Sequence, residues 1–329
     1  MTLAFTICSI NYLAQARTLG DSLRQTNPDW HYIIGLVDKL DQANLPAPLL
    51  PDYPMLEVDQ IEIEDFAGMC ERYDITELNT AVKPFYIDYF FRHYPDATEV
   101  IYFDPDIIVF QPLTELRQKL GTHNLVLTPH ICQPINDWLI PNELNHLNTG
   151  TFNLGFIGLQ KTDESNRFVQ WWKKRLVNEC RIDLCNGLFV DQHWVNFAPI
   201  YYDRVYIDKH PGYNAAYWNL HERFFSEQNG VWKVNETADL RFFHYSGYGI
   251  HKPQEVSKYQ NRFTFEARPD IVPLFDLYRQ RLLDNHNETY RAYPCFYIKP
   301  PKVLYYQKVR KTLKSPLETL LSKLKEGYS

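Results

Sequence analysis

The sequence predicts an α/β fold built on a mixed, mostly parallel sheet that is flanked by helices. Two observations point to it. Short apolar runs typical of buried strands alternate with helical stretches from Leu3 to Asp104. Two of these runs are also closed by an acidic residue, Asp38 and Asp104. Ligands bind beyond the carboxyl ends of the strands in such sheets, so we expect a binding site at this edge.

The first elements follow in order along the chain. Leu3–Cys8 is an apolar run that predicts a buried strand. A helix over about Leu13–Gln25 ends before Asn27-Pro28, because proline disfavours helical conformation in the residue that precedes it. Tyr32–Val37 is a second apolar run and predicts the second strand.

The next strand and helix lead to the acidic pair. Leu56–Ile63 alternates apolar and polar residues, which predicts a half-buried strand. A helix is expected over about Ala81–His93, where Pro84 is tolerated because it falls in the first turn. The following strand ends at Asp104, because Pro105 stiffens the backbone and removes a hydrogen-bond donor from the ladder.

Beyond the acidic pair the pattern is less regular. The expected elements are strands at Asn124–Thr128 and Phe152–Leu159, an amphipathic helix at Asp163–Arg181, and apolar runs at Val205–Ile207 and Arg241–Tyr245 that end near His210 and His244. From about Ile271 the chain turns helical. We therefore expect residues 1–270 to form one α/β domain and residues 271–329 to form a helical extension with a basic tail.

A final helix is expected over roughly Val303–Lys325, after Pro300-Pro301. The last segment is basic and opposes only Glu318 and Glu326 to Lys299, Lys302, Lys308, Arg310, Lys311, Lys314, Lys323 and Lys325. Five leucines are interleaved with these residues: Leu313, Leu317, Leu320, Leu321 and Leu324. Such a helix could lie on an anionic membrane surface. It could equally dock on the domain and expose a solvated basic face.

Charge and cysteine usage narrow the class of protein. A net charge of −6 and a pI near 6.0 argue against a nucleic-acid binder. The six cysteines are scattered without a Cys-x-x-Cys pair, and Leu3–Ile10 is too short and lacks the basic flank of a secretory leader. We therefore expect free thiols and a cytoplasmic protein. No apolar stretch approaches the roughly 18–20 residues of a membrane span.

The tetrad Asp104-Pro105-Asp106-Ile107 is the strongest functional signal. Two hard oxygen ligands on a rigid turn suit a divalent cation that takes its remaining ligands from water and a diphosphate. A plain turn at the end of a strand is the structural alternative, since Asp and Pro are both common turn residues.

A phosphatase of the haloacid-dehalogenase type would also carry Asp-x-Asp after an apolar strand. That family generally has Thr or Val two residues after the second Asp and a Gly-Asp pair downstream. Here Ile108 occupies the first position and no Gly-Asp pair follows Asp106, so the acids that such a site requires are missing.

Four further segments carry ligand-binding residue types. They are Thr6-Ile7-Cys8-Ser9-Ile10-Asn11-Tyr12, Phe152-Asn153-Leu154-Gly155, Asp191-Gln192-His193-Trp194-Val195-Asn196, and His244-Tyr245-Ser246-Gly247 followed by His251-Lys252-Pro253. A tyrosine ring can stack on a base, a glycine permits close approach of the backbone to a ligand, and histidine is a metal ligand. Asp191 could instead be the N-cap of a helix.

In this order and at these separations, the five segments resemble the retaining glycosyltransferases of the galactosyltransferase and glycogenin-like family (family 8 type), which have the GT-A fold, a Rossmann-like fold for nucleotide-diphospho-sugars. The resemblance spans about residues 3–253. It implies Mn²⁺ (or Mg²⁺) as cofactor, a nucleotide-sugar, UDP-linked, as donor, and a glycan, a lipid-linked sugar or a protein as acceptor. No nucleic acid is expected as a partner, and the tail would supply any peripheral contact with the inner membrane surface.

Individual roles follow from the resemblance residue by residue. Asp104, Asp106 and His244 would hold the metal ion. Asp191 and Gln192 would be catalytic, by stabilising positive charge on the sugar ring. The residues that would bind the donor are Thr6, Cys8, Asn11, Tyr12, Asp38, Lys83, Asn153, Gly155, Gly247 and Lys252. The alternative function is a non-catalytic protein of the same fold that binds a nucleotide-sugar or acts as a scaffold.

One departure from the family pattern concerns the last motif. The family usually places two residues between its final glycine and lysine, whereas four residues separate Gly247 from Lys252. The longer loop leaves open whether Lys252 or His251 reaches the diphosphate.

Overall fold

The computed structural model describes residues 1–298, and the expected tail helix lies outside them. The centre of the described chain is a seven-stranded sheet in the order β10-β6-β7-β4-β1-β2-β3. Its strands are β1 (Thr2–Cys8), β2 (His31–Leu36), β3 (Met55–Glu57), β4 (Glu99–Phe103), β6 (Leu125–Pro129), β7 (Phe152–Gln160) and β10 (Val205–Ile207). All neighbours pair in parallel except β7, which runs antiparallel to β4 and β6. The expected mixed, mostly parallel sheet is therefore confirmed.

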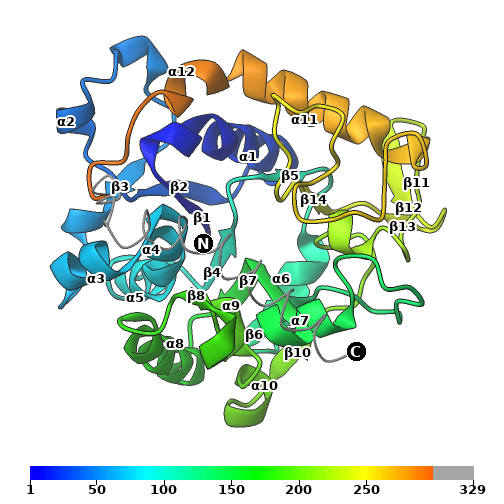
Figure 1. Cartoon of the computed structure of the whole chain (residues 1–329). Helices are drawn as coiled ribbons and strands as arrows, with labels where there is room; N and C mark the ends of the chain where they lie inside the picture. Colours follow the sequence, from blue (N-terminus) through cyan, green and yellow to red (C-terminus); the bar gives the residue numbers. More distant parts are fainter. Residues whose placement is uncertain (299–329) are drawn as a thin grey trace, which may run out of the picture.

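Helices cover both faces of this sheet (Figure 1). The longer ones are α1 (Leu13–Thr26), α5 (Lys83–His93), α8 (Asp163–Leu176) and α11 (Val272–Asp284). The shorter ones are α2 (Leu40–Ala43), α3 (Phe66–Arg72), α4 (Ile75–Ala81), α6 (Thr114–Leu120), α7 (Glu143–Thr149), α9 (Gln192–Val195), α10 (Ala198–Tyr201) and α12 (Asn287–Arg291). Small strands complete the fold: β5 (Ile107–Val109), β8 (Ile182–Asp183), β9 (Leu188–Phe189), β11 (Phe225–Gln228), β12 (Val231–Val234), β13 (Ala238–Asp239) and β14 (Phe242–His244).

The alternation of side chains along β1 creates two cores. Leu3, Phe5 and Ile7 point to the face that α5 and α8 cover, because successive residues of a strand face opposite sides. Ala4 and Cys8 point to the other face, where they pack with residues of α1 and α11. Both faces are buried, as expected for parallel strands.

Two expected elements differ from the structure in length. The strand expected at Leu56–Ile63 is short, because Gln60 Oε1 accepts a hydrogen bond from the Glu57 amide and closes a 3₁₀ turn at Val58–Gln60. The helix expected at Asp163–Arg181 ends at Leu176. There the Tyr73 hydroxyl donates to the Leu176 carbonyl (2.7 Å) and accepts from the Cys180 amide (3.0 Å), so it replaces helical hydrogen bonds.

The acidic tetrad connects the seven-stranded sheet to a separate two-stranded sheet. β4 ends at Phe103, and the chain leaves the large sheet through Asp104-Pro105-Asp106. It then forms β5, which pairs antiparallel with β14 in a separate two-stranded sheet. Because His244 is the last residue of β14 and is aligned with Ile107, this pairing carries the histidine to the acidic turn.

The C-terminal helices pack against the first helix. α11 and α12 lie beside α1 on one side of the sheet (Figure 1). Asn285 Nδ2 donates to Thr18 Oγ1 (3.0 Å), and Gln15 Nε2 donates to Asn287 Oδ1 (3.1 Å). Across residues 1–298, no helix has both the length and the apolar character needed to cross a membrane.

Candidate active site

The turn that carries the two carboxylates is fixed from both sides. The Asp104 amide donates to the Gly155 carbonyl of β7 (2.7 Å), and the Tyr245 amide donates to the Asp106 carbonyl (2.8 Å). Pro105 between them has no amide hydrogen to be satisfied. The turn therefore holds both acidic side chains on the same side, next to the end of β14.

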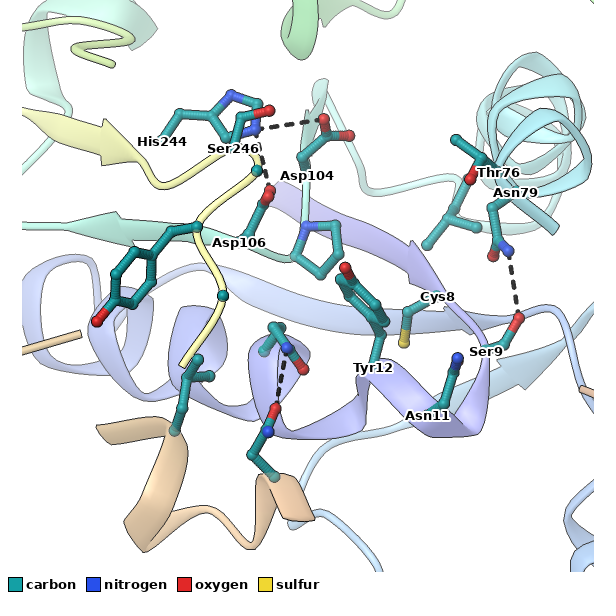
Figure 2. A pocket seen from close by; sticks show the side chains of 18 of the residues that line it. Cys8, Ser9, Asn11, Tyr12, Thr76, Asn79, Asp104, Asp106, His244 and Ser246 are labelled. Atoms are coloured by element: carbon teal, nitrogen blue, oxygen red, sulfur yellow. Dashed lines mark hydrogen bonds and ion pairs between the residues drawn. The ribbon is translucent and has the colours of Figure 1, made fainter. Parts of the chain in front are cut away.

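Asp104, Asp106 and His244 form a cluster suited to a divalent cation (Figure 2). His244 Nε2 lies 2.9 Å from Asp106 Oδ1 and 3.6 Å from Asp104 Oδ2. One ligand atom from each residue lies within 4.8 Å of the others. Two carboxylates and an imidazole are ligand types that Mn²⁺ accepts.

The electrostatics of the cluster agree with a cation site. Burial of His244 lowers its pKa, but the negative charges of Asp106 and Asp104 outweigh this effect and raise the pKa overall. The two carboxylates thus attract positive charge to the position of the imidazole. Tyr102 also donates its hydroxyl to Asp104 Oδ1 (2.6 Å), which fixes the orientation of that carboxylate.

A cavity of about 590 Å³ opens beside this cluster. It is lined by Asp104, Asp106 and His244 at one end and by Asn11, Tyr12 and Asn79 among other residues. In Figure 2, Tyr12 lies between the acidic cluster and the polar group formed by Ser9 and Asn79. Its size and its mixture of aromatic and polar side chains are typical of a small-molecule site.

The loop that carries Asn11 and Tyr12 is held in place by Asp38. The carboxylate oxygens of Asp38 accept hydrogen bonds from the amides of Ile10 (3.1 Å), Lys39 (3.0 Å) and Phe296 (2.8 Å). Asp38 is buried and does not line the cavity. In this structure it orders the loop after β1.

Helix α4 supplies the opposite wall of the cavity. It begins with a capping box, in which Asp74 Oδ1 accepts from the Glu77 amide and Glu77 Oε2 accepts from the Asp74 amide. Asn79 Nδ2 donates to Ser9 Oγ (3.2 Å) and to the Ile75 carbonyl (2.7 Å). The buried oxygens Asn79 Oδ1 and Asn11 Oδ1 have no partner among the described residues, so both are free acceptors.

A buried charged pair lies behind the acidic cluster. Lys83 Nζ contacts Asp191 Oδ2 at 2.5 Å, donates to the Leu154 carbonyl (2.8 Å) and lies 4.1 Å from the centre of the Tyr102 ring. Both charged side chains are almost fully buried. Burial raises the pKa of Asp191, and the charge and hydrogen bond of Lys83 act against this effect. Lys83 therefore keeps Asp191 in a defined orientation.

Gly155 packs directly against His244, and Asn153 is hydrogen-bonded beside it. Asn153 Oδ1 accepts from the Gly155 amide (3.1 Å) and from Asn214 Nδ2 (3.0 Å). A Cβ atom at Gly155 would lie 2.4 Å from His244 Cε1, so only glycine leaves room for the ring. Gln192 lies farther along, where its Nε2 donates to the Thr149 carbonyl (2.7 Å).

The structure brings many of the expected residues together, but not all of them. The expected residues that line the cavity are Cys8, Asn11, Tyr12, Asp104, Asp106, His244 and Gly247. The expected residues that surround the cluster from behind are Lys83, Asn153, Gly155 and Asp191. The other expected residues, Thr6, Asp38, Gln192 and Lys252, do not line the cavity in this structure.

Several cavity residues were not expected from the sequence. They are Thr76, Asn79, Tyr102, Lys258, Tyr259, Tyr278, Asn287 and Arg291, among others. Tyr102 could have been predicted from the sequence. Residues two apart on a strand share a face, and Asp104 lies two residues beyond Tyr102. The side chains of α4, α11 and α12 carried none, because their place at the cavity depends on how distant elements pack.

Comparison of the sequence with those of known proteins finds two uncharacterized relatives. No model of a known protein family matches the sequence. The uncharacterized protein YfnF of Bacillus subtilis (strain 168) is 25% identical over 289 residues, which cover 86% of this chain and 92% of YfnF. The uncharacterized protein YfnD of the same strain is 22% identical over 77% of this chain and 79% of its own length.

Among solved structures, the galactosyltransferase LgtC in complex with donor and acceptor sugar analogs matches with a TM-score of 0.51. The match covers 86% of this chain and 96% of LgtC, at 14% sequence identity. The described chain therefore has the α/β fold of a glycosyltransferase of the GT-A type, as expected.

Proposed function

We propose that this protein is a metal-dependent glycosyltransferase that moves a hexose from a nucleotide-sugar, UDP-linked, to a glycan, a lipid-linked sugar or a protein. The observation that carries the proposal is the cluster of Asp104, Asp106 and His244 at the end of a cavity of about 590 Å³. A cavity of this size accommodates a nucleotide. The fold shared with a galactosyltransferase supports the same reaction class.

In this proposal each part of the site acts on one part of the donor. Asp104, Asp106 and His244 would hold Mn²⁺ or Mg²⁺, which would supply Lewis-acid stabilisation of the negative charge that grows on the leaving diphosphate. Asn11 and Tyr12 contact the base and ribose, with Thr6 and Cys8 beside them. Gly247 lies against the diphosphate.

The sugar would lie toward the buried side of the cluster. Lys83 fixes Asp191, and Asn153, Gly155 and Gln192 surround the same region. As the bond to the diphosphate breaks, the sugar ring gains positive charge, which the Asp191 carboxylate or the Gln192 carbonyl stabilises. Retention of the anomeric configuration belongs to the proposal and rests on the resemblance of the ordered motifs to those of retaining glycosyltransferases.

The substitution Asp106→Asn tests the proposal most simply. It removes a charged ligand but keeps the shape of the side chain, so we expect turnover of the UDP-sugar to fall about a thousandfold or more while the fold is kept. Release of UDP in the presence of Mn²⁺ is the measurement, and the exposed Asp52→Asn variant is the matched control. A fully active Asp106→Asn variant would contradict the assignment of Asp106 as a metal ligand.

The same assay addresses the alternative function. A wild-type chain that binds UDP with Mn²⁺ but turns over no UDP-sugar would favour the non-catalytic nucleotide-sugar-binding protein. The membrane contact of the tail stays a prediction, because residues 299–329 lie outside the described part of the chain. The cytoplasmic location is also a prediction.

A further inference from the structure

The lysine of the last sequence motif lies away from the cavity. Lys252 does not line it, and 65% of its side chain is exposed. Its Nζ atom lies 3.2 Å from Glu255 Oε1, three residues along the chain, so its charge is compensated locally. The neighbouring His251 pairs with Glu288 (3.3 Å), and both of these side chains are also exposed. The side chains of His251 and Lys252, on the longer loop after Gly247, are thus both exposed and paired with glutamates.

Two other cations line the cavity in their place. Lys258 and Arg291 are the lysine and the arginine among the described residues that contribute to its wall. Within residues 1–298 neither of them forms an ion pair, in contrast to Lys252. Lys258 Nζ lies 4.8 Å from the centre of the Tyr259 ring, and no carboxylate of the described residues neutralises either cation.

Lys258 is held beside the motif glycine. Its amide donates to the Gly247 carbonyl (3.1 Å). Gly247 has a φ of +74°, and a Cβ atom there would lie 2.4 Å from Ser257 Oγ and 2.6 Å from the ring of Tyr259. The chain around Lys258 therefore packs on Gly247 as closely as a glycine allows. This contact holds the backbone of Lys258 beside the motif glycine, and its side chain belongs to the wall of the cavity.

Arg291 reaches the same cavity from the end of α12. That helix is anchored by the hydrogen bond from Gln15 to Asn287 and packs against the loop that carries Tyr12. Desolvation and the charge of Asp106 raise the pKa of Tyr12 to about 12, whereas the charge of Arg291 lowers it. Arg291 is thus within electrostatic reach of the ring that lies beside the acidic cluster.

The charge balance of the site calls for cations at this position. A divalent ion on Asp104 and Asp106 is neutralised by the two carboxylates, so the negative charge of a bound diphosphate stays uncompensated without further cations. Lysine binds phosphate as a point charge, and the planar guanidinium of arginine binds it with two parallel hydrogen bonds. Both groups are available here.

We propose that Lys258 and Arg291, rather than Lys252, hold the diphosphate of the donor in this chain. The inference rests on the proposed function, because it assumes a nucleoside diphosphate in the cavity. It assigns part of the donor site to the C-terminal helices, beyond the segments that carry the sequence motifs.

Binding measurements on the full chain test this inference. The wild-type chain is first titrated with UDP, CDP, ADP and GDP at saturating Mn²⁺, and the tightest of the four becomes the probe. We expect Lys258→Gln and Arg291→Gln each to weaken binding of the probe about tenfold. Loss of one hydrogen bond to a charged group typically reduces affinity by about this factor. The nucleoside without phosphates should bind all variants within about twofold of the wild type. Both side chains are exposed, so the variants should keep the melting temperature of the wild type.

The matched controls are Lys174→Gln and Arg181→Gln, which remove exposed cations outside the cavity. The inference is overturned if the cavity variants bind the diphosphate like the controls, if they lose equal affinity for the free nucleoside, or if Lys252→Gln weakens binding as much as Lys258→Gln. A wild-type chain that binds none of the four diphosphates overturns the proposed function itself, and this inference with it. The two failures are therefore distinguishable.

Discussion

Lys83 and Asp191 form an ion pair that is almost fully buried. Their side chains are 1% and 2% exposed. Burying two charges is costly, and their attraction offsets the cost only with good geometry and further hydrogen bonds. Lys83 meets this condition through the Leu154 carbonyl and the face of the Tyr102 ring. The pair also links the expected catalytic carboxylate to the tyrosine that orients Asp104.

Removing one partner of this pair should lower the free energy of unfolding more than removing the charge of both partners. We expect Lys83→Met to lower the free energy of unfolding by about 3–5 kcal/mol, because it leaves the Asp191 carboxylate buried without a cation. Lys83→Met combined with Asp191→Asn should recover a large part of that loss. Urea unfolding of the single and double variants gives the coupling energy. A loss below about 1 kcal/mol for Lys83→Met alone would show that the carboxylate is not isolated as described.

At the scale of elements, β7 contains two glycines with different surroundings. A Cβ atom at Gly155 would collide with the ring of His244, whereas one at Gly158 would meet its nearest neighbour, a methyl group of Leu120, at 3.3 Å. The central strand therefore contacts the candidate metal ligand His244 through one residue that has no side chain.

This difference predicts opposite outcomes for the same substitution. Gly155→Ala should displace His244 and weaken Mn²⁺ binding about tenfold or more, since changes next to metal ligands typically cost that much. Gly158→Ala, the control on the same strand, should bind Mn²⁺ as the wild type does. Titration calorimetry with Mn²⁺ measures both. Equal affinities in the two variants would contradict the close packing of β7 against the histidine.

Helix α7 carries a buried histidine that makes stability depend on pH. Burial, and then the charges of His221 and Arg262, lower the pKa of His146 from 6.5 to about 4. His146 stacks on His130, whose pKa burial also lowers. At this residue the unfolded chain therefore binds more protons than the folded chain between about pH 6.5 and pH 4, so the contribution of His146 to stability is fully present above pH 6.5 and is lost as the pH falls.

We expect His146→Gln to flatten this dependence. A lowering of the pKa from 6.5 to about 4 corresponds to a loss of about 3 kcal/mol of stability on acidification. Urea unfolding at several pH values between 7 and 4 measures the slope for the wild type and the variant. If the two slopes agree over this range, His146 is not held neutral by the fold.

For the molecule as a whole, the sequence was informative where local patterns decide the structure. β1, α1, β2, α5 and β10 lie within two residues of where periodicity and proline position put them. The elements that differ are decided by single tertiary contacts, such as the Tyr73 hydroxyl that ends α8. No local pattern reports a contact between residues about a hundred positions apart.

The same distinction applies to the site. Asp104, Asp106 and His244 were predicted because an ordered set of motifs identified them, and the pairing of β5 with β14 brings them together. Lys258 and Arg291 belong to no motif, so their position became visible only from the packing of α12 and of the chain around Gly247. The boundary expected at residue 270 stays a prediction, although Tyr278 and Leu282 of α11 line the same cavity as the motif residues.

Thermal unfolding of the full chain with nucleotides, with and without Mn²⁺, tests the central claim most directly. A ligand at a hundred times its Kd adds roughly 2.7 kcal/mol to stability, which gives a clear rise in the melting temperature. We predict that UDP or a UDP-sugar raises the melting temperature of the wild-type chain only when Mn²⁺ or Mg²⁺ is present. Equal melting temperatures with every nucleotide, whether metal is present or not, would contradict a metal-dependent nucleotide-sugar site in this cavity.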